Sequence, residues 1–286
     1  MKILLTGGDG FFGSRFLARF GERHRILATD VGTLDITRPE QVEAAFEQFR
    51  PELVLHAAAV AETAWCERQP GLAQRINVDG ALNVGRACRA SGARLVFISS
   101  EQVFNGNEEG GPYAETAAPR PDTVYGRNKL EAEGALRELL GDDALWVLRF
   151  TWLFGLPERH GAAGVNVLWN AIGSALRGEK RTERSDERRG LTYVHDLLDR
   201  FEDIVGLPGG LYHVGSRNDL SRFDIARLIL RQLGLESRED VLLDPVCGSQ
   251  PRDVRLDVGK LAAAGVAFPS SEEALTRCLA EFRFRV

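Results

Sequence analysis

Near its N-terminus the chain reads Thr6-Gly7-Gly8-Asp9-Gly10-Phe11-Phe12-Gly13. An apolar run, Lys2–Thr6, precedes this segment, and an amphipathic run, Phe11–Phe20, continues from it. Glycines at this spacing let the backbone turn sharply after a strand, approach a pyrophosphate and bring the next helix close to the sheet. The segment therefore predicts a dinucleotide-binding loop that opens a Rossmann-type fold.

The rest of the first half alternates between two kinds of pattern. Apolar runs with the length of buried strands are Arg25–Asp30, Leu53–Ala58, Ala93–Ser100 and Leu145–Phe150. Amphipathic runs between them are Pro39–Phe49, Gly71–Ser91 and Thr123–Leu140. This rhythm predicts an α/β protein with a Rossmann-type doubly wound parallel sheet. We expect residues 1–150 to form the NAD(P)-binding domain.

Residues 151–286 are expected to form a smaller α/β substrate-binding region, with the chain crossing back to the sheet near residues 190–215. A strand is predicted at Gly210–Val214 and a helix at Phe223–Leu233. The segments Gly155–Val165 and Glu179–Gly190 are expected to be loops. The mixed charges of Arg177–Arg189 favour a solvated loop, although one or two of its arginines could reach a phosphate.

Two helix starts carry local signals. Thr37-Arg38-Pro39-Glu40 has the spacing of a capping box, with the proline early in the helix. Ser221-Arg222-Phe223-Asp224 repeats this spacing before the helix predicted in the second half, and Gly234 is placed to end that helix.

Composition excludes several classes of protein. The 286 residues carry a net charge of −5, so no overall positive field attracts nucleic acid. No run of about eighteen apolar residues predicts a membrane span. Four cysteines without a Cys-x-x-Cys pair favour free thiols, and no residue cluster calls for a metal. We expect a cytoplasmic protein, for which a homodimer is compatible with the sequence.

Asp30 ends the second predicted strand, twenty residues after Gly10. A carboxylate at this place binds the hydroxyls of the adenosine ribose and repels a 2′-phosphate. The cofactor is therefore expected to be NAD or NADP, with NAD favoured.

Tyr125 and Lys129 stand four residues apart in a predicted helix, so both side chains lie on one face. A phenol is a poor proton donor at neutral pH, and a neighbouring ammonium lowers its pKa. Ser99 and Ser100 end a predicted strand at the carboxyl edge of the sheet, where ligands of such folds bind. Together these residues predict a site for proton transfer beside a dinucleotide.

These features resemble the extended short-chain dehydrogenase/reductase family. The matching segments appear in the family's order: Thr6–Gly13, His56–Ala59, Ile76–Val78, Ser99-Ser100 and Tyr125–Lys129. Within the family the chain is most similar to dTDP-4-dehydrorhamnose reductases. That likeness rests on Ser100–Gly106, Thr151–Phe154, Leu211–His213 and Pro251–Asp257, and it is looser after Trp152.

The resemblance implies reduction of the C4 ketone of a nucleotide-linked 4-keto-6-deoxysugar. Tyr125 would give the proton, Ser100 would polarise the ketone, and Lys129 would tune Tyr125 and hold the ribose. The implied cofactor contacts are Gly7, Asp9, Gly10, Phe11, Phe12, Gly13, Asp30, Asp35, Ile36, Ala57, Ala58, Ala59, Asn77, Ser99, Tyr125 and Lys129. The implied substrate contacts are Glu101, Gln102, Val103, Phe104, Trp152 and Arg252. Asn77 would also support the helix of Lys129.

Glu101 and Gln102 depart from the family's patterns. Reductases of this type carry Asp-Tyr there, so the substrate can differ. Sugar 4,6-dehydratases carry Asp-Glu, and Gln102 cannot exchange a proton, which disfavours elimination. Epimerase-reductases of the GDP-fucose synthase type carry a cysteine where Glu101 stands. Two alternatives stay open: a non-catalytic NAD(P)-binding regulatory subunit, as in the β subunit of methionine adenosyltransferase, and a nucleotide-sugar epimerase.

Overall fold

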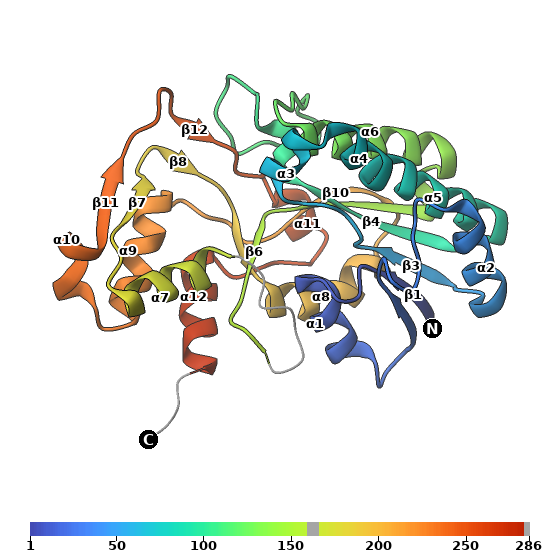
Figure 1. Cartoon of the computed structure of the whole chain (residues 1–286), viewed down its shortest axis with the longest axis horizontal. Coiled ribbons are helices and arrows are strands. Elements are labelled where there is room, and N and C mark those ends of the chain that lie inside the picture. Colours follow the sequence, from blue (N-terminus) through green and yellow to red (C-terminus); the bar gives the residue numbers. More distant parts are fainter. Residues whose placement is uncertain (159–165, 283–286) are drawn as a thin grey trace.

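The computed structural model describes residues 1–158 and 166–282. A parallel sheet of six strands lies at its centre, in the order β10-β5-β4-β3-β1-β2 (Figure 1). The strands are β1 (Lys2–Thr6), β2 (Arg25–Thr29), β3 (Leu53–His56), β4 (Arg94–Ser100), β5 (Leu145–Phe150) and β10 (Gly210–Val214). The predicted α/β fold is confirmed, and every predicted strand lies within two residues of its expected bounds.

Helices cover both faces of this sheet (Figure 1). The covering helices are α1 (Phe11–Phe20) and α8 (Val194–Gly206) on one face, and α2 (Pro39–Phe49), α5 (Gly80–Ser91) and α6 (Val124–Leu140) on the other. Because side chains alternate along a strand, Ile3 and Leu5 enter the core beneath α1, while Leu4 enters the core beneath α2. Burial on both faces explains why the strands read as continuous apolar runs.

The helix expected over Gly71–Ser91 is divided. It consists of α4 (Pro70–Gln74), one π-helical turn, η1 (Arg75–Asp79), and α5. The other short elements of the first half are α3 (Thr63–Arg68), η2 (Glu101–Phe104) and η3 (Asp142–Ala144).

The second half builds a smaller lobe beside the sheet (Figure 1). Its strands are β6 (Trp152–Phe154), β7 (Arg181–Arg184), β8 (Glu187–Arg188), β9 (Leu191–Tyr193), β11 (Leu243–Val246) and β12 (Arg252–Asp253), which pair as β6-β9, β7-β11 and β8-β12. Its further helices are α7 (Val167–Arg177), α9 (Arg222–Gln232), η4 (Glu236–Arg238), α10 (Glu239–Leu242), α11 (Gly259–Ala263) and α12 (Ser271–Glu281). Between them, β10 returns to the main sheet and pairs with β5.

The expectation of a loop over Glu179–Gly190 is wrong, because β7 and β8 lie within it. Each is a short strand that pairs with a strand from far later in the chain, and such pairing leaves little trace in the local sequence. Of the loop expected over Gly155–Val165, residues 159–165 lie outside the described residues.

One of the two predicted capping boxes forms. Ser221 and Asp224 bond reciprocally at the start of α9, and Gly234 follows its end with a φ of 72°. The box predicted at Thr37 is wrong. Its hydroxyl donates to Asp35 Oδ1 at 2.7 Å instead, and Arg38 precedes α2 without a side-chain cap.

All four cysteines are free thiols. Within the described ranges, no helix combines the length and the apolar character that crossing a membrane requires.

Candidate active site

The glycine loop joins β1 to α1 through a backbone that only glycine fits. Gly7 has a φ of 74°, and a Cβ there would lie 2.8 Å from the Ala58 nitrogen. A Cβ on Gly13 would overlap the carbonyl oxygen of Gly7. Gly10 precedes α1 and no side chain caps this helix, so its first N–H groups are left for another acceptor. The loop therefore fits the pyrophosphate of a dinucleotide, which needs both close backbone approach and N–H donors.

Two carboxylates meet beside this loop. Asp30 follows β2 and accepts hydrogen bonds from the backbone of Gly32 at 2.7 Å and Thr33 at 3.2 Å. A hydrogen bond between Asp9 and Asp30 raises the pKa of Asp9 and lowers the pKa of Asp30, and the Gly32 N–H lowers the latter further. The pair concentrates negative charge next to the predicted adenosine ribose.

Asp35 and Ile36, which are also predicted cofactor contacts, bond or pack with other residues of the protein. The Asp35 carboxylate accepts two hydrogen bonds from Thr37, which lower its pKa. The Ile36 side chain is buried in the core against Gly80, and its carbonyl oxygen accepts a bond from Asn83. The side chain of Ile36 is therefore not available to a ligand in this structure.

The two serines at the end of β4 have separate partners. The hydroxyl of Ser99 donates to Glu133 of α6, which pairs with Arg149 at 2.6 Å in the interior. Ser100 Oγ accepts from the backbone of Gln102 at 3.2 Å and bonds with Tyr125. Only Ser100 therefore presents its hydroxyl to the phenol.

Tyr125 and Lys129 lie one turn apart on α6, whose first turn is capped by Thr123. Lys129 Nζ donates to the carbonyl oxygen of Ile98 at 2.8 Å and lies 5.7 Å from the centre of the Tyr125 ring. Burial lowers the pKa of Lys129 to about 8. The prediction that Lys129 lowers the pKa of Tyr125 is not met here, because burial, followed by the charge of Glu101, raises that pKa.

Asn77 supports the loop after β3 rather than Lys129. Its amide oxygen accepts from the Val60 nitrogen at 2.8 Å, and its amide nitrogen donates to the Val60 oxygen at 3.0 Å. The expected support of the Lys129 helix comes from the η1 turn that carries Asn77, which packs against α6, and not from the Asn77 side chain. Ala57, Ala58 and Ala59 form the half-buried start of the same loop, facing Gly7.

Of the predicted substrate contacts that follow Ser100, some lie at the site and others are buried in the core. Gln102 Oε1 accepts from Thr63 at 3.2 Å. Val103 and Phe104 have no exposed surface and pack with Tyr113 and Leu256. Their prediction as substrate contacts is wrong in this structure, because the η2 turn directs both of them into the interior.

Glu101 lies fully buried beside Tyr125. Its Oε1 accepts from Arg189 Nη1 at 3.1 Å, and its Oε2 is buried without a hydrogen-bond partner among the described residues. Burial raises the pKa of Glu101 to about 7.

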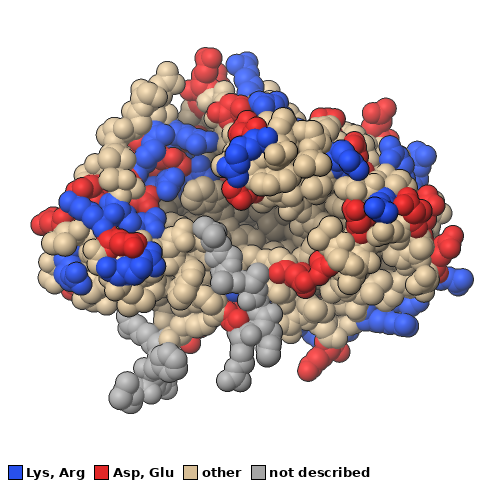
Figure 2. All heavy atoms as spheres, viewed as in Figure 1, with Lys and Arg blue, Asp and Glu red and all other residues tan. Residues whose placement is uncertain are grey.

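The solvated loop predicted over Arg177–Arg189 is wrong. Glu183, Glu187 and Arg189 are buried and belong to a connected ion network. Arg222 joins this network through Glu183 at 2.8 Å. Figure 2 shows basic and acidic side chains gathered on this lobe, beside a hollow near the centre of the face.

Trp152 lies at this network. The guanidinium carbon of Arg189 is 3.8 Å from the centre of the indole ring, and that of Arg222 is 5.4 Å away. Arg252, from β12, contributes a buried Nε with no hydrogen-bond partner in the described chain. Sequence reasoning missed Arg189, Glu187 and Arg222. Side chains two residues apart lie on one face of a strand, and Glu187 and Arg189 have this spacing. Such charged pairs are the sequence signal that could have indicated a buried strand here.

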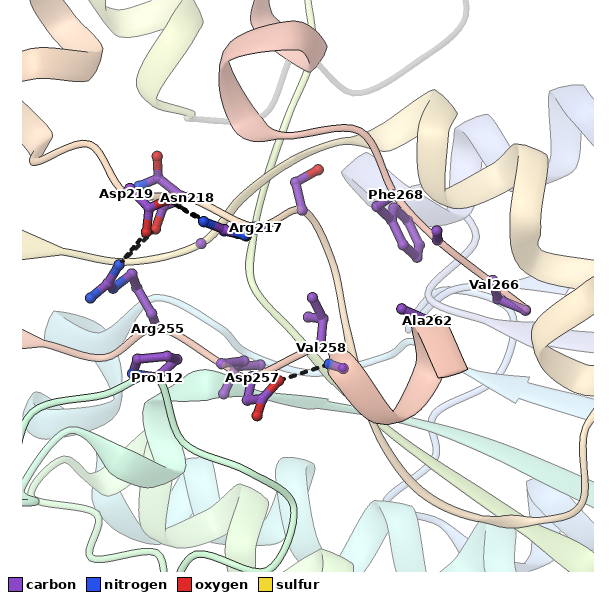
Figure 3. Close-up of a pocket in the computed structure, with 15 residues that line it drawn as sticks. Pro112, Arg217, Asn218, Asp219, Arg255, Asp257, Val258, Ala262, Val266 and Phe268 are labelled. Atoms are coloured by element: carbon purple, nitrogen blue, oxygen red, sulfur yellow. Dashed lines mark hydrogen bonds and ion pairs between the residues drawn. The ribbon is translucent and has the colours of Figure 1, made fainter. Parts of the chain in front are cut away.

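A separate cavity of about 650 Å³ lies at the end of β10, and Figure 3 shows its lining. Phe268, Val258 and Ala262 form its apolar side. On its polar side Arg217 and Arg255 both pair with Asp219, at 3.1 and 2.7 Å. Ser100, Tyr125 and Lys129 do not line this cavity, so it is distinct from the candidate active site.

No group of three or more His, Cys, Asp or Glu side chains that could hold a metal ion exists in the two described ranges.

Comparison with known proteins gives concordant results. The family model for the RmlD substrate binding domain matches residues 1–284. The dTDP-4-keto-6-deoxy-D-glucose reductase of Streptomyces niveus is 31% identical, covering 82% of this chain and 80% of its own. The β subunit of methionine adenosyltransferase 2 from Xenopus laevis is 26% identical, covering 93% and 83%. The crystal structure of dTDP-4-dehydrorhamnose reductase from Bacillus anthracis, in complex with NADP, superposes with a TM-score of 0.87 at 29% identity, covering 98% of both chains.

Proposed function

The chain belongs to the RmlD substrate-binding-domain family of extended short-chain dehydrogenases/reductases, and on this premise we propose that it reduces the C4 ketone of a nucleotide-linked 4-keto-6-deoxysugar with NAD(P)H. The observation that carries the proposal is the convergence of Ser100, Tyr125 and Lys129 at the end of β4, beside the glycine loop. Residues 1–150 would hold the dinucleotide, and residues 151–286 would mainly bind the sugar nucleotide.

The chemistry needs a hydride on the carbonyl carbon and a proton on its oxygen. A bound reduced nicotinamide supplies the hydride. Tyr125 donates the proton, and Ser100 donates a hydrogen bond that stabilises the negative charge growing on the oxygen. Lys129, fixed by its bond to Ile98, would hold the ribose of the cofactor.

The glycine loop, Ala57, Ala58 and Asn77 are proposed to line the cofactor, with NAD favoured over NADP. The paired carboxylates of Asp9 and Asp30 support this preference, because they repel a 2′-phosphate. The relative from Bacillus anthracis was solved with NADP, so the proposed preference for NAD rests on the local charge of this chain and not on the shared fold.

Arg222 and Arg252 are proposed to bind the diphosphate of the substrate. Each has a buried Nε without an acceptor among the described residues, and an unsatisfied buried donor is costly. A guanidinium matches the geometry of phosphate oxygens. Trp152 and Gln102 would then face the sugar, whereas Glu101, also expected as a substrate contact, has no exposed surface and bonds Arg189 instead.

The test measures oxidation of NADH and NADPH with a panel of dTDP-, UDP- and GDP-4-keto-6-deoxysugars. We expect turnover with one nucleotide class, lost by at least about a hundredfold in Tyr125→Phe. Tyr212→Phe is the matched control, because its hydroxyl donates to the carbonyl oxygen of Pro208 and Tyr212 is not among the proposed site residues. Full activity of Tyr125→Phe would refute the assignment, and interconversion of sugars without net oxidation would instead identify an epimerase.

A second candidate function is a regulatory subunit, favoured by the likeness to the methionine adenosyltransferase β subunit over most of the chain. Size-exclusion chromatography with a methionine adenosyltransferase catalytic subunit tests it. A stable complex, together with dinucleotide binding but no turnover of any keto-sugar, would support this function over the reductase.

A further inference from the structure

Arg189 connects three parts of the molecule from a buried position. It lies between β8 and β9 with 4% of its surface exposed. Its Nη1 bonds Glu101, while its Nε and Nη2 bond Glu187 Oε1 at 2.9 and 2.7 Å. Its guanidinium also stacks on the indole of Trp152 at 3.8 Å. One side chain therefore joins the end of β4, the small lobe and the aromatic ring.

This arrangement suits arginine alone. A guanidinium is planar, so it can stack on an aromatic face while its edges donate to carboxylates in two directions. Lysine carries the same charge but has no plane to stack and no fork. The backbone of Arg189 is fixed as well, because its carbonyl oxygen accepts from Asn218 at 2.7 Å.

Glu101 is the partner that brings this arginine to the reduction site. It follows Ser100 directly in the chain and lies close enough to Tyr125 for its charge to act on the phenol. The charged or titratable groups that face it are Arg189, Arg252, Glu187 and Tyr125. Removing one partner of such a buried pair leaves an uncompensated charge, so the two side chains hold each other strongly in place.

We propose that Glu101 and Arg189 form a hydrogen-bonded clasp that fixes the indole of Trp152 against the reduction site, so that Arg189 is a positioning residue for substrate binding. This inference rests on the proposed function, in which Trp152 lines the sugar-binding pocket. The bond to Glu101 sets the distance between the small lobe and Ser100, and the stacked guanidinium sets the plane of the indole.

The first test compares Arg189→Met and Arg189→Lys with Arg217→Met, a control in an exposed ion pair of the same lobe. We expect Arg189→Met to raise KM for the keto-sugar by about tenfold or more, while kcat changes by less than about threefold, because positioning acts before the chemical step. Arg189→Lys should recover only part of the loss, since charge alone does not orient the ring. A KM unchanged in both variants would overturn the proposal.

The second test is a double-mutant cycle. If Glu101 acts through Arg189, Glu101→Gln combined with Arg189→Met should raise KM no further than the larger single effect. Multiplying effects would show that the two residues act separately, which contradicts the clasp. Thermal unfolding midpoints of the same variants show whether a loss of activity reflects only a smaller fraction of folded protein.

The third test needs no substrate and thus separates this inference from the proposed function. Acrylamide quenching of tryptophan emission should increase in Arg189→Met but not in Arg217→Met. The increase should vanish in a Trp152→Phe background, which leaves the other three of the four tryptophans. Absence of keto-sugar turnover in the parent protein would refute the proposed function alone, whereas unchanged quenching would refute the clasp alone. Should Arg189→Met fail to fold, Arg189→Lys supplies the same readout.

Discussion

Lys129 Nζ donates a hydrogen bond to the carbonyl oxygen of Ile98, at 2.8 Å, and so joins helix α6 to the strand that ends at Ser100. This bond holds the ammonium beneath the Tyr125 ring. Because the strand also carries Ser100, one contact sets the relative positions of all three proposed catalytic side chains.

Replacing Lys129 should affect cofactor binding in a pH-dependent manner. Its pKa of about 8 implies that the ammonium loses its proton above that pH, and with it a charge-assisted bond worth about 1.5–3 kcal/mol. We expect the Kd of the dinucleotide to rise above pH 8 in the parent protein, by roughly tenfold or more. Lys129→Arg should bind without this alkaline limb, because arginine does not deprotonate.

Fluorescence titration of the dinucleotide between pH 6 and 10 measures this effect. Lys180→Met is the control, since Lys180 is an exposed partner of Asp244. An alkaline limb retained in Lys129→Arg would exclude Lys129 as its source.

Asp30 should set the choice between NAD and NADP. Asp30→Asn keeps an acceptor for the Gly32 N–H and removes only the charge beside the predicted ribose. We expect the ratio of kcat/KM for NADPH over NADH to rise by about tenfold, which corresponds to about 1.4 kcal/mol. The exposed Asp203→Asn should leave the ratio unchanged, and an equal ratio in both variants would count against this role.

Gly13 should tolerate no side chain. An added Cβ would overlap the Gly7 carbonyl and lie 2.9 Å from the Gly8 Cα, so the loop and α1 must separate. We expect Gly13→Ala to lower the free energy of unfolding by about 1–3 kcal/mol and to abolish dinucleotide binding. Urea denaturation and titration measure the two effects.

The matched control for this substitution is Gly134→Ala. A Cβ at this position of α6 meets nothing within 4 Å, so alanine should stabilise the helix by about 0.5–1 kcal/mol. Equal behaviour of the two variants would mean that the loop adapts to a Cβ.

Two buried histidines should make the fold sensitive to acid. Burial lowers the pKa of both His56 and His213 to about 3, below the ordinary value of 6.5. The stability they contribute is present above pH 6.5 and is lost as the pH falls toward 3, because the unfolded chain binds the protons more readily. The slope can reach about 2.7 kcal/mol per pH unit, twice the value for one proton.

Glu101 acts in the opposite direction. Its pKa is raised to about 7, so its contribution is present below the ordinary carboxyl pKa and is lost as the pH rises through 7. Thermal midpoints between pH 4 and 8 test both groups. We expect the thermal midpoint of the parent protein to fall both toward pH 4 and toward pH 8. The midpoint of Glu101→Gln should fall less than that of the parent toward pH 8. A midpoint that does not change between pH 6.5 and 4 would refute the histidine account.

The sequence predicted those parts of the fold whose signal is local and repeated. The strands are buried on both faces and read as apolar runs, and the glycine loop is defined by spacing alone. The position of Ser100 at the same edge of the sheet as the glycine loop also followed from the sequence, because parallel strands end at one edge of the sheet.

What the sequence did not predict depends on partners distant in the chain. Thr37 has the spacing of a cap, but Asp35 competes for its hydroxyl. The charges of Arg177–Arg189 look solvated until β11 and β12 pair with β7 and β8 and bury them. Burial likewise decides the pKa of Tyr125, and a spacing of four residues between a tyrosine and a lysine carries no information about burial.

The return of β10 to the main sheet has a consequence for how the chain can be divided. A fragment of residues 1–150 would end with β5 as an uncovered edge strand, exposing the backbone groups that pair Trp146–Phe150 with Gly210–Val214. Such an edge is a template for pairing with other chains, so we expect the fragment to aggregate more readily than the intact protein. Because a strand of the second half completes the sheet of the first, we expect the two halves of the chain to unfold in one cooperative transition rather than in sequence.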